Sequence, residues 1–294
     1  MPQAKIGVIG GSGLYDIEGL TDIEEVNLNT PFGQPSDTIT VGRLEGVGIA
    51  FLPRHGKGHR ISPTEVPARA NIYALKSLGV EHLISVNAVG SFKSEVKPGD
   101  LVIIDQTIDR TRNRVNTFFE DGIVAHVQFA DPFCPVLSQI LYQAAVETKA
   151  TVHQGGTCVV MEGPAFSTRA ESRLYRSWGA DVIGMTTLPE AKLAREAELC
   201  YAIIAGVTDY DSWHEESEPL LIEVLISILR QNIDTIKKII KLAVNRMPEK
   251  RDCPCATALE TAIVTPAELI PAEQKEKLNL LIGKYLTETM GDRL

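Results

Sequence analysis

The hydrophobic positions of the chain gather in short runs rich in valine and isoleucine, and glycine, proline or aspartate bounds each run. Several runs are continuous rather than alternating, which is typical of strands buried on both faces of a sheet. The pattern therefore predicts strands at residues 5–10, 48–53, 82–87, 100–105, 156–161, 181–185 and 201–207.

Helical periodicity lies between some of these strands. It predicts helices at residues 66–78, 135–149, 168–178, 189–198 and 220–244. Strands interleaved with helices indicate an α/β fold with a largely parallel or mixed sheet. In such sheets ligands gather at the carboxyl ends of the strands and in the loops that follow.

Nothing in residues 1–246 has the composition of a linker, so we interpret them as one domain. Residues 245–256 (NRMPEKRDCPCA) break the pattern, and an amphipathic helical pattern resumes at residues 272–287. We expect residues 247–294 to form a C-terminal extension with one amphipathic helix, packed on the same or a neighbouring subunit.

Composition and charge narrow the function. Of the 294 residues 44% are hydrophobic and 23% charged, as in globular proteins, and the net charge of -9 argues against a nucleic-acid partner. The N-terminal MPQAKIGVIGG lacks a secretory pattern, and charged residues interrupt the most apolar segment, 220–244, so we expect no membrane span. These features, with five cysteines expected to be reduced thiols, favour a cytoplasmic location.

The first candidate site is the GGSG sequence at residues 10–13, directly after the first strand. Free backbone N–H groups and the Ser12 hydroxyl suit a phosphate oxygen, although a tight turn explains the glycines equally well. The spacing fits neither a Walker loop nor the dinucleotide fingerprint. This counts against an oxidoreductase that uses a dinucleotide.

Arg54 and His55 follow the second strong strand. An arginine there can make a forked contact to an oxyanion, or it can cap the sheet or pair with a carboxylate. His55 and His59 have the spacing of a helical metal pair, but Gly56 and Gly58 disfavour a helix. We expect no metal site.

Three further strand ends carry polar residues. Asn87 and Ala88 follow one strand and Met185-Thr186-Thr187 another, and each group on its own could be a turn or a helix cap. Asp209 and Asp211 end the apolar run 202–207. A carboxyl group desolvated there has a raised pKa and can donate a proton near neutral pH, whereas the alternative is a solvated acidic turn.

Taken in order, these motifs resemble the trimeric purine-nucleoside phosphorylase family, in its methylthioadenosine phosphorylase branch. The resemblance covers residues 4–245 and rests on IGGSGL (9–14), TPFGQPSD (30–37), RHG (54–56), AVGS (88–91), PGDLVIIDQTID (98–109), DPFCP (131–135), EGPAFSTR (162–169), WGADVIGMTTLPE (178–190) and TDYDSW (208–213). It implies a single-domain, three-layer α/β fold with a central mixed sheet flanked by helices.

The resemblance also implies an activity. A member of this branch splits 5′-methylthioadenosine with inorganic phosphate into adenine and 5-methylthioribose 1-phosphate, in purine and methionine salvage. It is a homotrimer, binds only small molecules and needs no cofactor beyond phosphate as co-substrate. The alternatives are a methylthioinosine phosphorylase, a broad purine-nucleoside phosphorylase, or a nucleoside-binding protein without activity.

Carried over to this sequence, the resemblance implies roles for individual residues. Met185 would pack under the ribose, Phe166 would stack on the purine, and His126 would reach into a neighbouring subunit's site. Asp209 and Asp211 would contact the base, with Asp209 as the proton donor to N7. The phosphate site would consist of Ser12, Arg54, His55, Asn87, Ala88 and Thr186.

Two positions would set specificity. Relatives that act on 6-oxopurines have Glu in place of Ser167 and Asn in place of Asp209, so the residues present here favour adenine. They also place a histidine near the 5′-hydroxyl, where this chain has Ile222 and, less directly, Leu225, which suit a methylthio group.

The cysteines give a weaker signal. A bridge between Cys253 and Cys255 would be strained and easily reduced, so we expect free thiols there in a reducing cytosol. The alternative is a regulatory or stabilising disulfide, because some thermophilic relatives carry a similar Cys-x-Cys near the C-terminus. We interpret Cys134, Cys158 and Cys200 as core residues.

Overall fold

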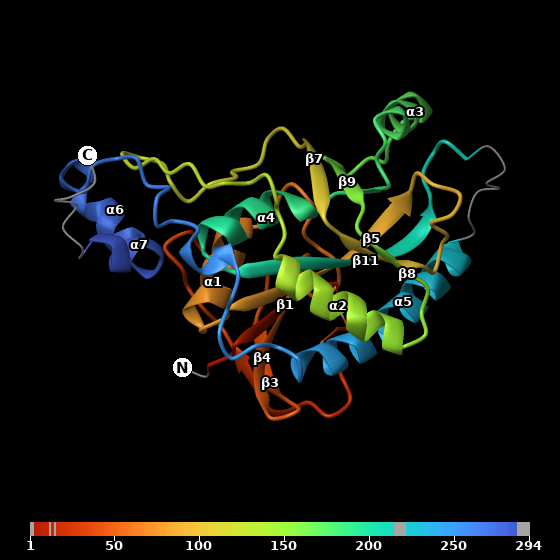
Figure 1. Cartoon of the computed structure of the whole chain (residues 1–294), viewed down its shortest axis with the longest axis horizontal. Helices are drawn as coiled ribbons and strands as arrows, with labels where there is room; N and C mark the ends of the chain where they lie inside the picture. Colours follow the sequence, from red (N-terminus) through yellow and green to blue (C-terminus); the bar gives the residue numbers. More distant parts are fainter. Residues whose placement is uncertain (1–2, 12, 15, 215–221, 287–294) are drawn as a thin grey trace.

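A large mixed sheet lies at the centre of the molecule (Figure 1). The computed structural model describes residues 3–11, 13, 14, 16–214 and 222–286, without the side chain of Ile222. Its strands are β1 (Ile6–Gly10), β2 (Thr21–Val26), β3 (Ile39–Leu44), β4 (Val47–Pro53), β5 (His82–Ser91), β6 (Leu101–Ile104), β7 (Gln106–Arg110), β8 (Val152–Gln154), β9 (Thr157–Met161), β10 (Val182–Gly184) and β11 (Cys200–Tyr210).

The long strand β5 organises the sheet. It pairs in parallel with β1 and β11 and in antiparallel with the short β10, while β1 also pairs in parallel with β4. The carboxyl ends of four parallel strands, β4, β1, β5 and β11, therefore meet at one edge. In this register Gly10 lies beside Pro53, Ile9 beside Ser85 and Ala88 beside Gly206.

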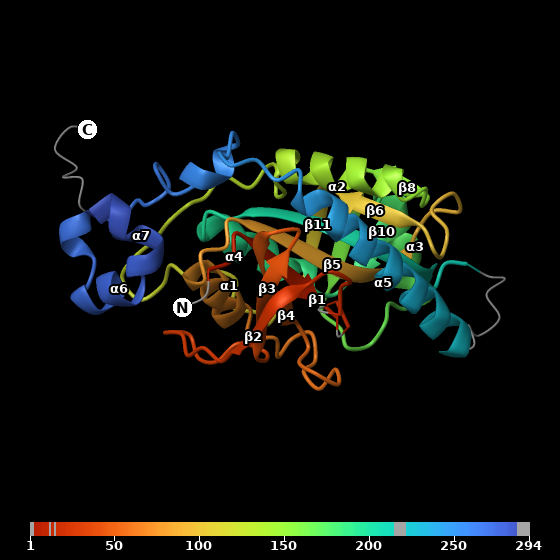
Figure 2. The same ribbon diagram turned by 90° about the horizontal axis from the view of Figure 1, so that it is seen from below.

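Helices cover both faces of the sheet, which gives the expected three layers (Figures 1 and 2). Side chains of β11 alternate between two hydrophobic clusters: Tyr201 and Ile203 pack with α1 and α4, and Ala202 and Ile204 with α2 and α5. The helices are α1 (Ala68–Ser77), α2 (Pro135–Glu147), α3 (Arg169–Ser177), α4 (Thr187–Glu196) and α5 (Ile222–Val244). The three-layer α/β prediction is confirmed.

Local sequence explains where two of the helices begin. Helix α2 starts with Pro135, whose missing N–H costs nothing in the first turn, after Cys134 at the N-cap. Helix α3 begins with a capping box, in which Thr168 and Glu171 satisfy each other's backbone N–H groups. None of the described helices is long and apolar enough to cross a bilayer.

Two strands run further than the hydrophobic pattern predicted. Strand β5 ends at Ser91 instead of residue 87, and β11 ends at Tyr210 instead of residue 207. Ala88 and Asp209 are therefore strand residues rather than loop residues, and Asn87 lies within β5 rather than at its end. Polar side chains hide this continuation from a hydrophobicity pattern, but the ladder between β5 and β11 extends through them.

The C-terminal extension differs from the single helix expected. It contains the 3-10 helices η1 (Pro254–Thr257) and η2 (Ala267–Leu269), followed by the short helices α6 (Ala272–Lys277) and α7 (Asn279–Leu286). Leu278 is the C-cap of α6, and Leu278 and Ile282, one helical turn apart, are both fully buried in the core.

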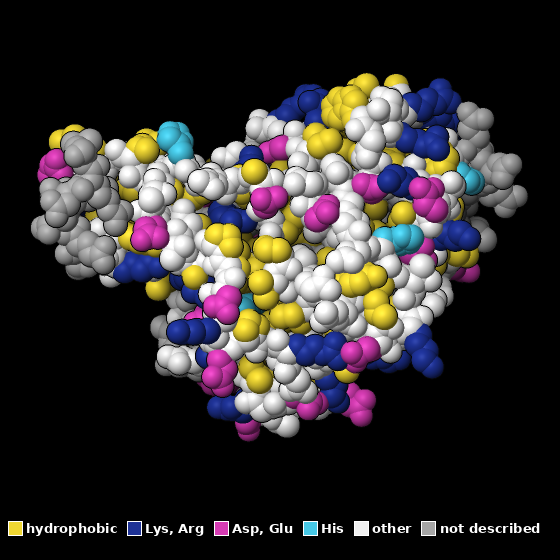
Figure 3. Space-filling view, in the orientation of Figure 1, with side chains coloured by type: hydrophobic (Ala, Val, Ile, Leu, Met, Phe, Trp, Pro, Cys, Tyr) yellow, Lys and Arg dark blue, Asp and Glu magenta, His cyan; other side chains and the backbone are white. Residues whose placement is uncertain are grey.

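The extension packs on its own chain and carries a projection at one end of the molecule. Residues 115–127 run beside residues 259–286, joined by backbone bonds such as His126 N to Ala262 O (2.8 Å), and we call these two segments the arm. Glu198 anchors the extension through its side chain, which accepts hydrogen bonds from Leu259 N (3.1 Å) and Tyr285 Oη (2.5 Å). The arm stands out from the body in Figures 1, 2 and 3.

Candidate active site

A buried ion pair lies at the carboxyl ends of β1, β4 and β5. The Arg54 guanidinium donates from Nε to Glu190 Oε2 (2.8 Å) and from Nη2 to Glu190 Oε1 (3.0 Å), and both side chains are only 3% exposed. Arg54 also donates to the carbonyl oxygens of Val86 (3.0 Å) and Ile9 (3.2 Å). The guanidinium thus ties three strand ends to helix α4.

Polar side chains complete the shell around this pair. Tyr201 Oη donates to Glu190 Oε1 (2.8 Å), and the Ser85 hydroxyl lies 2.7 Å from Arg54 Nη2 and 2.8 Å from Glu190 Oε1. Ser85 also lies 3.0 Å from Asn87 Oδ1, and Asn87 Nδ2 donates to Thr187 Oγ1 (3.2 Å). The network therefore continues from the ion pair to the candidate residue Asn87.

Electrostatics favour the charged form of the Arg54 guanidinium. Burial alone would lower the pKa of Arg54, but the Glu190 carboxylate outweighs burial and raises it. Burial, and next the Glu190 charge, raise the pKa of Tyr201 well above its usual value, so its hydroxyl remains a donor. Of the two N–H groups on Arg54 Nη1, one bonds to Val86 O among the described residues, which leaves one for a ligand.

His55 follows Arg54 on a tight loop, and its ring is held in place from two sides. Its Nδ1 lies 2.8 Å from Ile61 O, and its ring stacks on that of His59 at 4.3 Å between centroids. Gly56 and Gly58 have φ of 71° and 82°, so the segment is a turn and not a helix, as predicted. Burial first, and the Arg54 and His59 charges, lower the pKa of His55 to about 4. At neutral pH the ring is uncharged, and because Nδ1–H donates to the carbonyl, Nε2 carries the lone pair.

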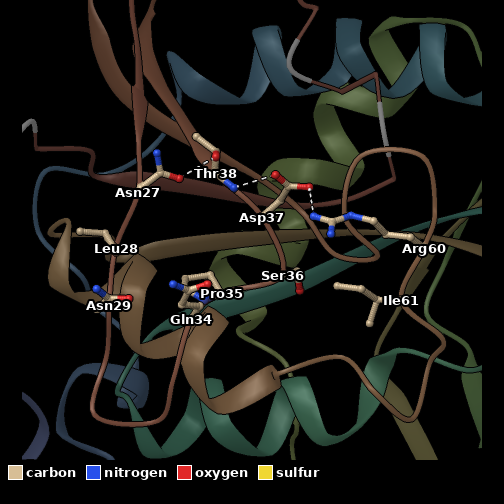
Figure 4. Close-up of a pocket in the computed structure, with 10 residues that line it drawn as sticks. All are labelled: Asn27, Leu28, Asn29, Gln34, Pro35, Ser36, Asp37, Thr38, Arg60 and Ile61. Atoms are coloured by element: carbon tan, nitrogen blue, oxygen red, sulfur yellow. Dashed lines mark hydrogen bonds and ion pairs between the residues drawn. The ribbon is translucent and has the colours of Figure 1, made fainter.

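A polar pocket of about 500 Å³ lies on the other side of this loop (Figure 4). Asp37 lines this pocket and accepts hydrogen bonds from Lys57 N (2.6 Å), Thr38 N (2.9 Å) and Arg60 Nη2 (3.2 Å). None of the predicted site residues lines it. Asp37 instead fixes the loop that carries His55.

Strand β11 bulges where the acidic candidates begin. Its register against β5 shifts between Val207 and Asp209, so Thr208 is the extra residue and Asp209 comes to lie beside Gly90. Thr208 Oγ1 donates to Asp209 Oδ1 (2.6 Å). A Cβ at Gly90 would come within 3.2 Å of Ile183 and would fill the space beside Asp209 Oδ2, at 3.6 Å, so the glycine keeps this space open.

The pKa of Asp209 is raised, mainly because burial penalises its charged form and secondarily because of Asp211. The hydrogen bond from Thr208 opposes the shift without cancelling it. Asp209 is thus a half-buried residue of strand β11 and does not lie in an exposed turn.

Asp211 and Ser167 form a second buried pair, 7% and 9% exposed. The Ser167 hydroxyl lies 2.7 Å from both carboxylate oxygens of Asp211 and donates to that carboxylate. Ser212 Oγ donates back to Ser167 O (3.0 Å). Two residues that are 44 positions apart in sequence, both singled out as candidates, thus lie in direct contact.

Sequence reasoning missed the two residues that hold the Met185 segment. Arg114 Nη1 donates to Met185 O (2.5 Å) and Leu188 O (2.6 Å), and its Nη2 donates to Glu162 O (2.6 Å). The Glu162 carboxylate accepts from Thr64 Oγ1 (2.6 Å) and from Arg114 Nε (3.3 Å). The only signal available was the occurrence of Glu162 in a matched motif, because Arg114 lies in a segment without periodicity.

The remaining candidate residues that the structure describes take no part in the hydrogen-bond network around Arg54 or in the pair of Ser167 and Asp211. Thr186 is the N-cap of α4 but makes no side-chain cap bond, and Leu225 is half-buried on α5. Phe166 is 81% exposed beside the buried Ser167. Exposed His126 lies on the arm and is not brought to the network. Ser12 and the side chain of Ile222, which opens α5, lie outside the described part of the chain.

Comparisons with known proteins agree over nearly the whole chain. The sequence profile of the Phosphorylase superfamily matches residues 5–245. The S-methyl-5′-thioadenosine phosphorylase of Geobacter sulfurreducens is 60% identical over 285 residues, which cover 97% of this chain and 100% of that protein.

Two solved structures extend the likeness to three dimensions. A methylthioadenosine phosphorylase from an antarctic soil metagenomic library superposes with a TM-score of 0.93 at 50% identity, covering 96% of this chain and 99% of that one. A variant of adenosine/methylthioadenosine phosphorylase from Schistosoma mansoni, in complex with methylthioadenosine, superposes with a TM-score of 0.79 at 38% identity, covering 85% and 93%.

The ion pair between Arg54 and Glu190 predicts a large stability effect. Glu190→Gln keeps the shape of the side chain but leaves the Arg54 charge buried without its counter-charge. We expect the free energy of unfolding to fall by about 3–5 kcal/mol, measured by urea denaturation.

The matched control is Glu147→Gln, which removes the carboxylate bonded to Arg246 Nη2 at 2.6 Å on the surface. It should cost at most about 1 kcal/mol, since water screens exposed pairs. Equal losses in the two variants would contradict a special role for the buried pair.

Proposed function

The chain belongs to the phosphorylase superfamily, and from this membership and the geometry of its site we infer that it catalyses phosphorolysis of 5′-methylthioadenosine, to give adenine and 5-methylthioribose 1-phosphate. The observation that carries the inference is the desolvated carboxyl of Asp209, beside the bonded pair of Ser167 and Asp211 at the carboxyl end of β11.

Phosphate binds at the ends of β4, β1 and β5 in this proposal. Arg54 contributes positive charge through its Nη1 edge, and His55 presents Nε2. Asn87 and the backbone at Ala88 line the site, Thr186 offers a hydroxyl that no helix cap uses, and Ser12 contributes from the loop after β1. The site holds phosphate in line with the anomeric carbon, so positioning and electrostatics supply most of the rate.

No covalent intermediate with the protein is needed. The bond between C1′ and N9 breaks, a phosphate oxygen bonds to C1′, and the bond electrons pass into the purine. Protonated Asp209 gives its proton to N7 as negative charge develops there, and solvent returns a proton to the carboxylate after adenine leaves. Desolvation keeps Asp209 protonated closer to neutral pH than an exposed carboxyl.

The polar groups suit adenine better than a 6-oxopurine. Asp211 already accepts from Ser167 but has lone pairs to spare for the 6-amino group of adenine. A carbonyl at C6 would face that carboxylate without a proton between them, which costs on the order of 1–3 kcal/mol. Phe166 stacks on the base, Met185 packs under the ribose, and Ile222 with Leu225 accommodates the 5′-methylthio group.

We also propose a homotrimer located in the cytoplasm, in which the arm carries His126 to a neighbouring subunit's site. Support comes from large apolar side chains that one chain leaves exposed on the arm and on α3, as expected of protein-protein contacts. Those on the arm are Val115, Val124, Val264, Leu269 and Leu280, and those on α3 and its end are Leu174 and Trp178.

The direct test compares methylthioadenosine, adenosine, inosine and methylthioinosine on purified protein, with and without phosphate. We expect adenine to be released fastest from methylthioadenosine and only when phosphate is present. Faster cleavage of the inosine compounds would contradict the roles of Ser167 and Asp209. No release from any nucleoside would favour a binding protein instead.

Asp209→Asn removes the proton that N7 needs. We expect kcat for methylthioadenosine to fall by about 100-fold or more, since general acid catalysis contributes that much. In the unchanged protein, activity falls as pH rises through the raised pKa of Asp209, because only the protonated form can donate. The variant should lack this alkaline limb and should act relatively better on inosine. A loss of less than a few-fold would rule out Asp209 as the acid.

The uncharged ring of His55 predicts a proton-linked response to phosphate. A bound phosphate dianion favours the charged imidazolium, so we expect the pKa of His55 to rise from about 4 when phosphate binds. Proton NMR of the imidazole signals, titrated with and without phosphate, measures this shift, and His55→Gln identifies the signal. An unchanged pKa would contradict a phosphate contact by His55.

A further inference from the structure

Four of the five cysteines converge on one point away from the candidate active site. The Sγ atoms of Cys134, Cys200, Cys253 and Cys255 all lie within 4.8 Å of one another, although the residues span more than a hundred positions in sequence. Every cysteine of the chain is a free thiol, and the fifth, Cys158, lies elsewhere in the core.

The four sulfurs have the spacing of a tetrahedral metal site. Zinc bonded to four thiolates at about 2.3 Å sets neighbouring sulfurs about 3.8 Å apart. The sulfurs of Cys200 and Cys253 are 3.3 Å apart, and no two of the four sulfurs are more than 4.8 Å apart. The sulfur–sulfur distances therefore lie on both sides of the distance expected around zinc. A short movement of the side chains would place all four at bonding distance from one ion.

The surroundings are those of a structural site. Cys134, Cys200 and Cys255 are each 1% exposed and Cys253 is half-buried, which leaves an entry path on one side. All four belong to or pack against the hydrophobic cluster beneath α2 and α5. Four cysteine ligands with no polar ligand leave no open position for a substrate, which is typical of structural zinc.

Donors are available to the sulfurs. Cys134 is the N-cap of α2 and its Sγ accepts from Leu137 N (3.5 Å), so the helix N-terminus favours a thiolate there. His82 at the start of β5 lies beside Cys200 in the strand ladder, and neither nitrogen of its buried ring has a hydrogen-bond partner among the described residues. Donors of this kind commonly support metal-bound thiolates.

We propose that Cys134, Cys200, Cys253 and Cys255 form a tetrathiolate zinc site that fastens the C-terminal extension to the catalytic domain. Two ligands come from the domain, at the start of α2 and at the start of β11, and two from the extension around η1. Binding displaces the thiol protons, and no oxidant or reductant is involved. The site is independent of the nucleoside chemistry and departs from the expectation that the chain binds no metal.

The test measures metal in the full-length protein, purified without a metal-affinity tag and under reducing conditions. We expect one zinc per chain by inductively coupled plasma mass spectrometry. Cobalt(II) exchanged into the site should give the visible bands of a tetrahedral ion and a thiolate-to-cobalt charge-transfer band. Both signals arise without any enzymatic assay.

Cys253→Ser removes the half-buried ligand and should abolish stoichiometric zinc while the domain stays folded. The matched control, Cys158→Ser, changes a buried cysteine outside the cluster and should retain one zinc per chain. A strong chelator should lower the Tm of the unchanged protein and of the control, but not that of Cys253→Ser. Zinc well below one per chain, equal zinc in the two variants, or a disulfide among the four cysteines in the reduced preparation would each overturn the proposal.

Discussion

The burial of Arg54 with Glu190 is the interaction on which the candidate site depends. Moving two charges out of water costs several kcal/mol for each ion, and only close geometry with additional hydrogen bonds offsets that cost. The chain meets this demand with carbonyl groups from two strands, with Ser85 and with Tyr201. These hydrogen bonds fix the ends of β1, β4 and β5 relative to α4. They thereby also fix the positions of His55 and Asn87, which belong to these segments.

The two ends of the candidate site favour opposite charge states of their ionisable side chains. The Glu190 carboxylate raises the pKa of Arg54 and so favours its charged form, whereas burial and the neighbouring Asp211 raise the pKa of Asp209 and so favour its neutral form. Strand β5 connects the two environments, since Asn87 belongs to the first and Gly90 to the second. In the proposed binding mode, a nucleoside that spans this distance meets the positive charge of Arg54 near its sugar and the carboxyl group of Asp209 at its base.

Hydrophobic patterning predicted the strands that build the site because they are buried on both faces, as β1 and β4 are. It missed β2, β3, β7 and β8, and it stopped β5 and β11 too early. Of the missed strands, β2 has the sequence TDIEEV and lies exposed at an edge without an apolar face. Arg54 and Asp209 were found from residue type and position at strand ends, whereas Ser167 came from the family resemblance. Glu190, Arg114 and the cysteine cluster were not found, because each acts through partners that only the tertiary fold brings near.

The partners Arg54 and Glu190 are separated by 136 positions, and this separation constrains the order of events during synthesis. When the first strands leave the ribosome, the carboxylate that will neutralise Arg54 has not yet been made. The guanidinium must stay hydrated until then, so the N-terminal part of the sheet cannot close on its own. Domains commonly fold as they emerge, N-terminal part first, but here native closure waits until most of the chain is available. A nascent chain of this protein therefore exposes apolar strands for longer than its compact final form suggests.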